Sequence, residues 1–357
     1  MDGQDTLLQL AEIRSKIISY KYIHVVTNDK FSASIVTFIL KHFDPPEHCF
    51  LFCGGRSADE FPIPEGDNIF SCSNPAVLAV SDAVSKIIFH GLYDGGVVKY
   101  LSEHPEIMAK SYWASWGGDL YDVPSTPTND YVHKNFQGVA VDAHGKMAYR
   151  QKYGEAKAFF PFNICFESIE YERIVATPVP QKKYVQIQVN NSAHPSTLEV
   201  FQALEKFRDE NIRVTTVLSY GRTTWNHKIL SEGHRIFGDK FCPVLNYIPK
   251  ETYIKLLARN DIYILNQERP QGVTTSFTSM VLGCKVFMRG GTSWHLHDEG
   301  YTVYDTQSIP GLSFEEFCAN PAKEENQRLA PMWFDPAAHK QCWKNIFDYE
   351  PPKPGGV

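Results

Sequence analysis

The architecture of this chain is clearest in residues 184–207, which read YVQIQVNNSAHPSTLEVFQALEKF. Val185, Ile187 and Val189 alternate with other residues, a pattern typical of a β-strand. Two asparagines and a serine interrupt the alternation, and apolar residues then return at helical spacing from Leu198 onwards. The stretch therefore predicts a strand, a polar loop and a helix, in that order.

The start of this helix is a candidate phosphate site. Ser196, or His194 together with Pro195, would begin the helix, and Glu199 fits a capping box with Ser196. A small polar loop before a helix presents backbone N–H groups and the positive end of the helix dipole, which suits a phosphate. Most such units bind nothing, so both interpretations of this stretch stay open.

Length and composition indicate a soluble protein of two domains. The chain has 357 residues, of which 43% are hydrophobic and 21% charged. The formal net charge of -6 argues against a general affinity for nucleic acid. The eight cysteines are scattered without a CxxC pair, so we expect reduced thiols in a cytoplasmic protein.

Neither a signal peptide nor a membrane-spanning segment is expected. The N-terminus begins with acidic residues and lacks a basic region followed by a long apolar core. No window approaches the roughly 18 consecutive apolar residues of a transmembrane helix. A role at a membrane would therefore be peripheral.

The first half of the chain alternates strands with helices. We expect a helix over residues 5–19, a strand over 22–26, a helix around 35–39 and short strands over 48–54 and 67–73. Residues 77–91 predict a helix that leads into a strand ending at His90 and Gly91. Such alternation implies a parallel sheet with ligand sites at the carboxyl ends of its strands.

Two segments of the first half combine aromatic residues, glycines and a carboxylate. Tyr93 and Asp94 lie in a loop after the strand that ends at His90, and an aromatic strand with Trp113 ends before Asp119. Aromatic faces stack on sugar rings and carboxylates accept hydroxyl protons, so the pattern favours a sugar site. A buried aromatic strand is usually core, and that interpretation stays open as well.

The proline-rich residues 176–183, ATPVPQKK, are a good linker, so we place the domain boundary there. The prediction is a first domain over 1–178, a second over 179–330, and a tail over 331–357 that crosses back or is loose. The second half repeats the alternation, with strands expected over 262–265 and 285–288 among others. The fold class is therefore α/β with two facing Rossmann-like domains. The cleft between them is the expected active site.

Four motifs resemble one family of bacterial glycosyltransferases. They are FHG at residues 89–91, WGGDLY at 116–121, NNS at 190–192 and PQG at 270–272. The TDP-N-acetylfucosamine:lipid II N-acetylfucosaminyltransferase family of enterobacterial common antigen synthesis has similar motifs, in the same order and spacing. Those are FHG, WGADLY, GNS and QQG. The resemblance implies the GT-B fold and a hexosyltransferase activity.

Two positions depart from the family pattern, because Asn190 and Pro270 replace a glycine and a glutamine. The resemblance implies a TDP- or UDP-linked sugar donor on the second domain and a glycan or lipid-linked acceptor on the first. The donor would contact two loops, the strand end between them and a base-binding segment: Asn190, Asn191, Ser192, Ser219, Tyr220, Gly221, Tyr247, Glu268, Gln271, Gly272, Val273, Thr274 and Thr275.

Each group of donor residues has a physical role. Backbone N–H groups of the two loops would hold the diphosphate, at the start of the two helices that follow them. Tyr247 would stack on the nucleobase, and Glu268 would accept hydrogen bonds from the ribose. Helix dipoles with Arg222 or Arg269 would balance the charge of the leaving diphosphate.

Catalysis needs a base for the acceptor hydroxyl. Asp119 and His90 are the preferred candidates, with Asp94 as a nearby carboxylate. No DxD pair lies between strands, so we expect no metal and no other cofactor. Residues 295–298, HLHD, keep a metal site open as an alternative.

The predicted function is thus transfer of a sugar, such as an acetamido-deoxy sugar, in the synthesis of a bacterial surface polysaccharide. A nucleotide-sugar epimerase or hydrolase and a non-catalytic sugar-binding protein are the alternatives. A lipid-linked acceptor would bring this cytoplasmic chain to the inner membrane surface, where first-domain lysines such as Lys99 and Lys110 would face anionic lipids.

Overall fold

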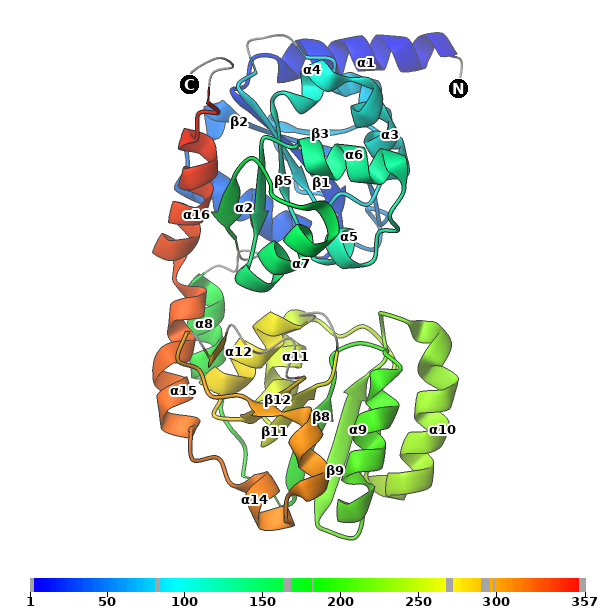
Figure 1. The fold of residues 1–357 in the computed structure, drawn as a ribbon, viewed down its shortest axis with the longest axis vertical. Coiled ribbons are helices and arrows are strands. Elements are labelled where there is room, and N and C mark those ends of the chain that lie inside the picture. Colours follow the sequence, from blue (N-terminus) through cyan, green and yellow to red (C-terminus); the bar gives the residue numbers. More distant parts are fainter. Residues whose placement is uncertain are drawn as a thin grey trace. The chain divides into compact units, whose positions relative to one another are not determined.

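The computed structural model describes residues 3–80, 84–162, 168–181, 183–267, 272–289, 296–297 and 299–352. It divides into two compact units (Figure 1). The first unit comprises Met1–Glu167 together with Pro336–Val357, and the second comprises Ser168–Asp335. The boundary therefore precedes the proline-rich linker rather than coinciding with it, because helix α8, Ser168–Ala176, belongs to the second unit.

The first unit is built on a seven-stranded parallel sheet in the order β3-β2-β1-β4-β5-β6-β7. The strands are β1 (Tyr22–Asn28), β2 (His48–Gly55), β3 (Ile69–Ser71), β4 (Lys86–His90), β5 (Ser111–Ala114), β6 (Gly138–Val141) and β7 (Phe159–Pro161). The order reverses between β1 and β4. In open parallel sheets, ligands bind beyond the carboxyl ends of the strands at such a reversal.

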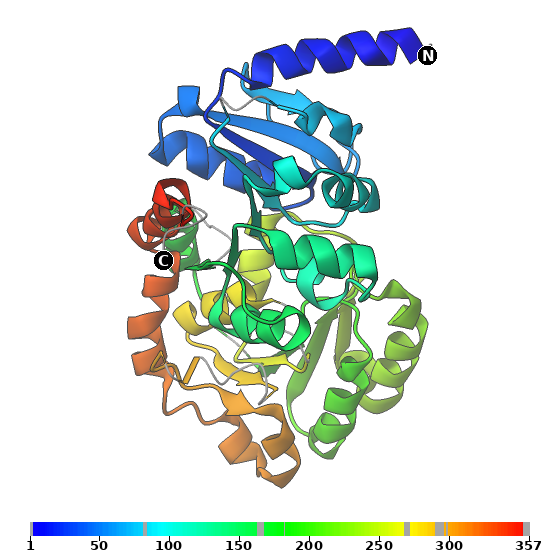
Figure 2. The same ribbon diagram turned by 45° about the horizontal axis from the view of Figure 1, so that its top comes forward.

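Helices cover both faces of this sheet (Figure 2). They are α1 (Gly3–Ile17), α2 (Ser32–His42), α3 (Gly95–Glu103), α4 (Pro105–Met108), α5 (Gly118–Tyr121), α6 (Pro127–Asn135), α7 (Ala143–Tyr153) and α16 (Pro336–Asp348). The helix predicted between residues 77 and 86 is wrong in its described part. Only a 3-10 turn, Pro75–Leu78, forms there, and Pro75 stands in its first turn, where a missing N–H costs nothing.

The C-terminal helix completes the core of the first unit. Trp343, Ile346 and Phe347 of α16 are at most 5% exposed and pack with Tyr22 and Val26 of β1. The α1 helix covers the opposite face through its buried apolar stripe, of which Leu10, Ile13 and Ile17 were predicted. The last helix is therefore part of the first hydrophobic core, although it is almost the whole chain away from β1 in sequence.

The second unit has a six-stranded parallel sheet in the order β10-β9-β8-β11-β12-β13. The strands are β8 (Val185–Val189), β9 (Ile212–Val217), β10 (Phe241–Val244), β11 (Ile262–Leu265), β12 (Lys285–Met288) and β13 (Tyr304–Asp305). Its helices are α8, α9 (Ser196–Leu204), α10 (Asn226–Phe237), α11 (Lys250–Leu257), α12 (Val273–Val281), α14 (Phe314–Cys318) and α15 (Lys323–Leu329). The order reverses between β8 and β11.

The opening stretch forms the predicted strand, loop and helix, and the strands predicted over 262–265 and 285–288 have the expected bounds. The predicted capping box is wrong. Pro195 occupies the N-cap position of α9, and the Glu199 carboxylate instead accepts a hydrogen bond from Asn266 Nδ2 at 3.0 Å. This contact connects α9 to the loop after β11.

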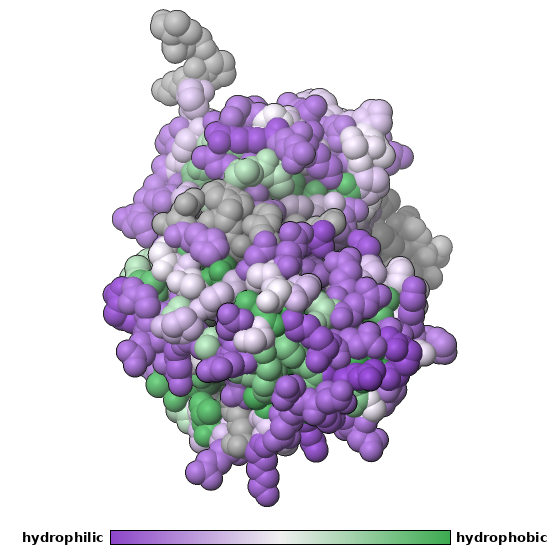
Figure 3. All heavy atoms as spheres, turned by 60° about the horizontal axis from the view of Figure 1, so that its bottom comes forward, coloured by the Kyte–Doolittle hydropathy of each residue, from purple (hydrophilic) through white to green (hydrophobic). Residues whose placement is uncertain are grey.

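The two sheets and their helices confirm the predicted α/β class with two Rossmann-like units. No helix in the described part of the chain is long and apolar enough to cross a membrane. The face shown in Figure 3 is mostly hydrophilic, with apolar residues in scattered patches.

Candidate functional site

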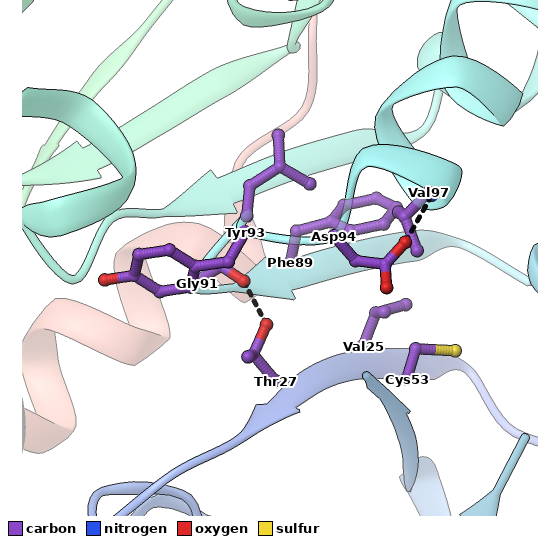
Figure 4. Close-up of a pocket in the computed structure, with 9 residues that line it drawn as sticks. Val25, Thr27, Cys53, Phe89, Gly91, Tyr93, Asp94 and Val97 are labelled. Carbon is purple, nitrogen blue, oxygen red and sulfur yellow. Dashed lines mark hydrogen bonds between the residues drawn. The ribbon is translucent and has the colours of Figure 1, made fainter. Parts of the chain in front are cut away.

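A small pocket lies at the strand-order reversal of the first unit (Figure 4). The carboxyl ends of β1, β2 and β4 and the first turn of α3 form its wall. The lining residues are Val25, Thr27, Cys53, Phe89, Gly91, Leu92, Tyr93, Asp94 and Val97. The pocket thus stands where a parallel sheet is expected to bind a ligand.

Asp94 contributes the carboxylate of this pocket. It is the N-cap of α3, and its Oδ1 accepts a hydrogen bond from the Val97 N–H at 2.9 Å. Gly54 packs against the other oxygen, since a Cβ on this glycine would lie 2.7 Å from Asp94 Oδ2. Burial, together with Cys72 and Asp94, raises the pKa of the Cys53 thiol to about 12. Asp94 therefore supplies the carboxyl group that the lining of the pocket offers to a ligand.

Tyr93 lies on the other side of the pocket and points away from Asp94 (Figure 4). Its side chain is 45% exposed. The phenol packs closely on Gly118, where a Cβ would lie 2.8 Å from Tyr93 Oη. The glycine of the WGGDLY motif thus makes room for an aromatic ring at the rim.

Asp119, by contrast, is fully buried, and its carboxylate accepts four hydrogen bonds. Its Oδ2 accepts hydrogen bonds from the Leu92 N–H at 2.9 Å and from Trp113 Nε1 at 2.7 Å. Its Oδ1 accepts from Ser115 Oγ and from the Trp116 N–H, both at 2.9 Å. Burial raises the pKa of Asp119, and the four donors oppose that shift. This carboxylate joins the loops after β4 and β5, and no acceptor hydroxyl reaches it in this conformation.

His90 is also buried, in a row of three histidines beneath α16. His90 Nε2 lies 2.9 Å from His24 Nδ1, and His24 Nε2 lies 3.0 Å from His48 Nδ1. All three side chains are at most 1% exposed, and Trp343 packs on His90. Burial lowers the pKa of His90 to about 3 and that of His48 to about 4. Of the three predicted catalytic residues, only Asp94 reaches the pocket.

The NNS loop lies at the strand-order reversal of the second unit. Asn190 has a left-handed backbone with φ of 51°, a conformation that asparagine adopts more readily than most residues. Its Oδ1 accepts from the Asn266 N–H and its Nδ2 donates to Thr197 Oγ1, both at 2.9 Å. The position taken by glycine in the similar family is thus compatible with asparagine, whose buried side chain contacts the protein.

Asn191 and Gln267 each carry a buried oxygen without a hydrogen-bond partner in the described part of the chain, namely Asn191 Oδ1 and Gln267 Oε1. Gln267 Nε2 donates to Ser192 Oγ at 3.1 Å, so the loops after β8 and β11 meet. Gly272, with φ of 84°, packs so closely on the Asn191 amide that a Cβ would overlap it. Unpartnered buried polar atoms are rare in proteins and call for an explanation.

The α12 helix begins beside this pair of amides. Val273, Thr274 and Thr275 form its first turn, where N–H groups lack helical acceptors, and no acidic residue stands in that turn. Within this turn, all of which is described, no carboxylate opposes the positive end of the helix dipole. Glu268 and Gln271 lie outside the described residues, as do Arg269 and His295.

The end of β9 completes this group. The Ala193 N–H donates to the Tyr220 carbonyl and the Arg222 N–H to the Ala193 carbonyl, both at 2.8 Å, so Ser219, Tyr220 and Gly221 adjoin the NNS loop. Tyr247, after β10, is 65% exposed. The structure thus brings together the described residues of three predicted donor segments.

Sequence reasoning missed Thr27, Cys53 and Gln267. Thr27, near the end of β1, and Gln267, after β11, are the first or second polar residues that follow an apolar run, and that position was the signal that could have found them. Cys53 belongs to a predicted buried strand, and it lies near the carboxyl end of β2, where it lines the pocket. Within the described residues, no three His, Cys, Asp or Glu side chains cluster as metal ligands.

Comparison with solved structures identifies the fold. An α,α-trehalose-phosphate synthase (UDP-forming) from Burkholderia vietnamiensis has a TM-score of 0.67 at 10% identity, covering 92% of this chain and 99% of that one. The chain has a GT-B glycosyltransferase fold. Anabaena HepE in complex with UDP and glucose has a TM-score of 0.66 at 12% identity, with coverages of 92% and 99%.

A trehalose-phosphate synthase from Burkholderia xenovorans in complex with glucose-6-phosphate has a TM-score of 0.64 at 8% identity, covering 92% of this GT-B chain and 100% of its own. No protein-family model matches the sequence, and no curated protein matches it either. The GT-B fold is thus shown by structure alone.

Proposed function

We propose that this GT-B chain transfers a sugar from a nucleotide-diphosphate donor to a hydroxyl group. The observation that carries the proposal is the contact of Asn191 with Gly272 at the start of α12. It combines a helix whose first turn contains no acidic residue with two buried amide oxygens, Asn191 Oδ1 and Gln267 Oε1, that lack partners within the described residues.

The second unit would bind the donor. N–H groups in the first turn of α12 suit the diphosphate, because it carries the negative charge that this end of a helix stabilises. Asn191 and Gln267 would accept hydrogen bonds from sugar or ribose hydroxyls, which would satisfy their unpartnered oxygens. The exposed Tyr247 ring would stack on the nucleobase, with Ser219, Tyr220 and Gly221 beside the diphosphate.

The first unit would bind the acceptor, and Asp94 would act as the base. The proton of the acceptor hydroxyl passes to Asp94, the acceptor oxygen bonds to the anomeric carbon, and the bond from that carbon to the diphosphate breaks. The diphosphate leaves with the electron pair. Asp94 is preferred over Asp119 and His90 because only its carboxylate lines a pocket.

The finer proposal follows from the resemblance of the four motifs. The donor would be a TDP- or UDP-linked acetamido-deoxy sugar, transferred without a metal to a glycan or lipid-linked acceptor of a bacterial surface polysaccharide. Such an acceptor would place the protein at the inner face of the membrane. The structural match to a protein that binds UDP and glucose supports a nucleotide-sugar donor of this general type.

Thermal-shift and calorimetric measurements with UDP, TDP, GDP and CMP test the donor site. We expect one nucleotide to stabilise the protein and Asn191→Asp to weaken its binding at least tenfold, because a carboxylate would repel the diphosphate. The control is Asn211→Asp, which makes the same change on an exposed residue at the amino end of β9. Failure of all four nucleotides to bind would refute the proposal.

A further inference from the structure

The residues that line the pocket beside Asp94 determine which acceptor groups can bind there. Its lining combines a carboxylate with apolar side chains, a threonine, a thiol and the phenol of Tyr93. Among these residues, all of them in the described part of the chain, none is a lysine, an arginine or a histidine. Positive charge is what strong recognition of a phosphate requires, so the lining lacks the cationic groups that recognise one.

Two donors of the lining residues are already engaged. Thr27 Oγ1 donates its proton to the Gly91 carbonyl, which leaves only oxygen lone pairs facing the pocket. The Val97 N–H at the start of α3 donates to Asp94 Oδ1. The helix N-terminus that would otherwise attract an anion is thus neutralised by the protein's own carboxylate.

The acceptors, by contrast, are available to a ligand. Asp94 Oδ2 accepts a hydrogen bond from no donor in the described part of the chain, and Gly54 beside it has no side chain to cover it. A hydroxyl that donates to Asp94 Oδ2 or to Thr27 Oγ1 would satisfy the oxygen that it reaches. The rim carries the exposed ring of Tyr93, on which a sugar ring can pack.

We infer that the group entering this pocket is a single uncharged hydroxyl of a saccharide, and that a phosphorylated sugar is rejected there by Asp94. The inference rests on the proposed glycosyl transfer and names the class of its acceptor. It separates this chain from the trehalose-phosphate synthase whose structure contains glucose-6-phosphate, although both have the same fold.

Cations near the pocket do not reverse this charge balance. The Arg56 guanidinium follows β2 but lies 3.7 Å from the Glu60 carboxylate, and both side chains are exposed. Lys99 lies in the second turn of α3 and is exposed. Exposed pairs of this kind contribute little and are screened by salt, whereas the Asp94 carboxylate faces the bound group directly.

Saturation-transfer NMR tests the inference with methyl glucoside, methyl galactoside and methyl N-acetylglucosaminide, each compared with its 6-phosphate. The protein is saturated with the nucleotide that binds best. We expect at least one uncharged glycoside to bind at least tenfold more tightly than its phosphate. Equal or tighter binding of the phosphates would overturn the inference, and so would the absence of binding by every sugar while the nucleotide binds.

Asp94→Asn shows whether the discrimination comes from this pocket. Asparagine is also a good N-cap, so α3 is retained while the negative charge is removed. The preference for the uncharged glycoside should fall at least fivefold. Asp142→Asn is the matched control, because Asp142 caps α7 in the same unit and is not part of the pocket. An unchanged preference in Asp94→Asn would overturn the assignment, whereas loss of nucleotide binding in the unmodified protein would refute the proposed function instead.

Discussion

The imidazoles of His24 and His90 lie on neighbouring strands, with His24 Nδ1 2.9 Å from His90 Nε2. His24 Nε2 lies 3.0 Å from His48 Nδ1, which extends the row. Of the two ring nitrogens outside these contacts, His90 Nδ1 is buried without a partner among the described residues. A buried unpaired N–H is rarer than a buried unpaired acceptor, so the row is best explained by His90 donating to His24 and His24 donating to His48.

This direction predicts one tautomer for all three rings, with the proton on Nε2. Two-dimensional 15N–1H spectra of the imidazoles distinguish Nε2–H from Nδ1–H tautomers directly. A spectrum in which His24 carries its proton on Nδ1 would contradict the proposed direction.

The same row predicts a loss of stability in acid. The folded-state pKa values, about 3 for His90 and about 4 for His48, lie below the unfolded value of 6.5, so the unfolded state binds more protons between those limits. The stabilisation is complete above pH 6.5 and is lost as the pH falls toward 4. At pH 5 the loss should be about 1–2 kcal/mol for each histidine.

Urea unfolding at pH 7.5 and pH 5 measures this loss. In His48→Gln the difference between the two pH values should shrink, because one titrating group is removed. The control is His227→Gln, in the exposed first turn of α10. An equal difference in the wild type and in His48→Gln would contradict the prediction.

Asp119→Asn should destabilise the first unit by about 2–4 kcal/mol. Asparagine has an NH2 group in place of one carboxylate oxygen. That group is itself a donor, and it would face two of the four donors that now bind Asp119. Urea unfolding measures the change. Unaltered stability with complete loss of sugar transfer would instead favour the original prediction that Asp119 is the base.

Gly272→Ala should abolish nucleotide binding, because the new Cβ would displace the Asn191 amide. Gly238→Ala is the matched control: Gly238 also has a positive φ, of 54°, but a Cβ there would meet nothing within 4 Å. It should cost only the backbone strain, about 1–3 kcal/mol. Calorimetric titration of the best nucleotide compares the two variants. Equal loss of nucleotide binding in both variants would contradict the prediction that a Cβ at residue 272 acts by displacing the Asn191 amide.

Trp343→Ala should destabilise the first unit by about 3–5 kcal/mol, since the indole is fully buried and packs on the His90 ring. Lys344→Ala, one residue further on the exposed side of α16, should change stability by less than about 0.5 kcal/mol. Chemical denaturation measures both. A negligible effect of Trp343→Ala would show that α16 is not part of this core.

Local patterns predicted most of the strands and the two-unit α/β class. The apolar runs at 262–265 and 285–288 gave correct bounds because buried parallel strands are continuous in sequence and end at polar residues. The position of α16 could not be predicted in this way. Trp343 and Phe347 contact β1 only through tertiary packing. The helical spacing of apolar residues does not reveal which strand a helix packs against.

The candidate site was predicted less completely, because the side chain of a polar residue at a strand end can point either into the core or toward a ligand site. His90 ends an apolar strand, and Asp94 and Asp119 come after apolar strands, yet His90 points into the core and Asp119 accepts hydrogen bonds from four donors in the interior. Only the N-cap geometry leaves Asp94 at the pocket. Residue type and spacing did not distinguish these surroundings, whereas burial and hydrogen bonds do.

The central proposal is that the chain transfers sugars from nucleotide diphosphates, with Asp94 as base. The most direct test is release of nucleoside diphosphate from a panel of UDP- and TDP-sugars in the presence of a mixture of uncharged glycans. We predict acceptor-dependent release that falls by about 10²–10⁴ in Asp94→Asn and is retained in Asp142→Asn. No release from any donor, or full release by Asp94→Asn, would contradict it.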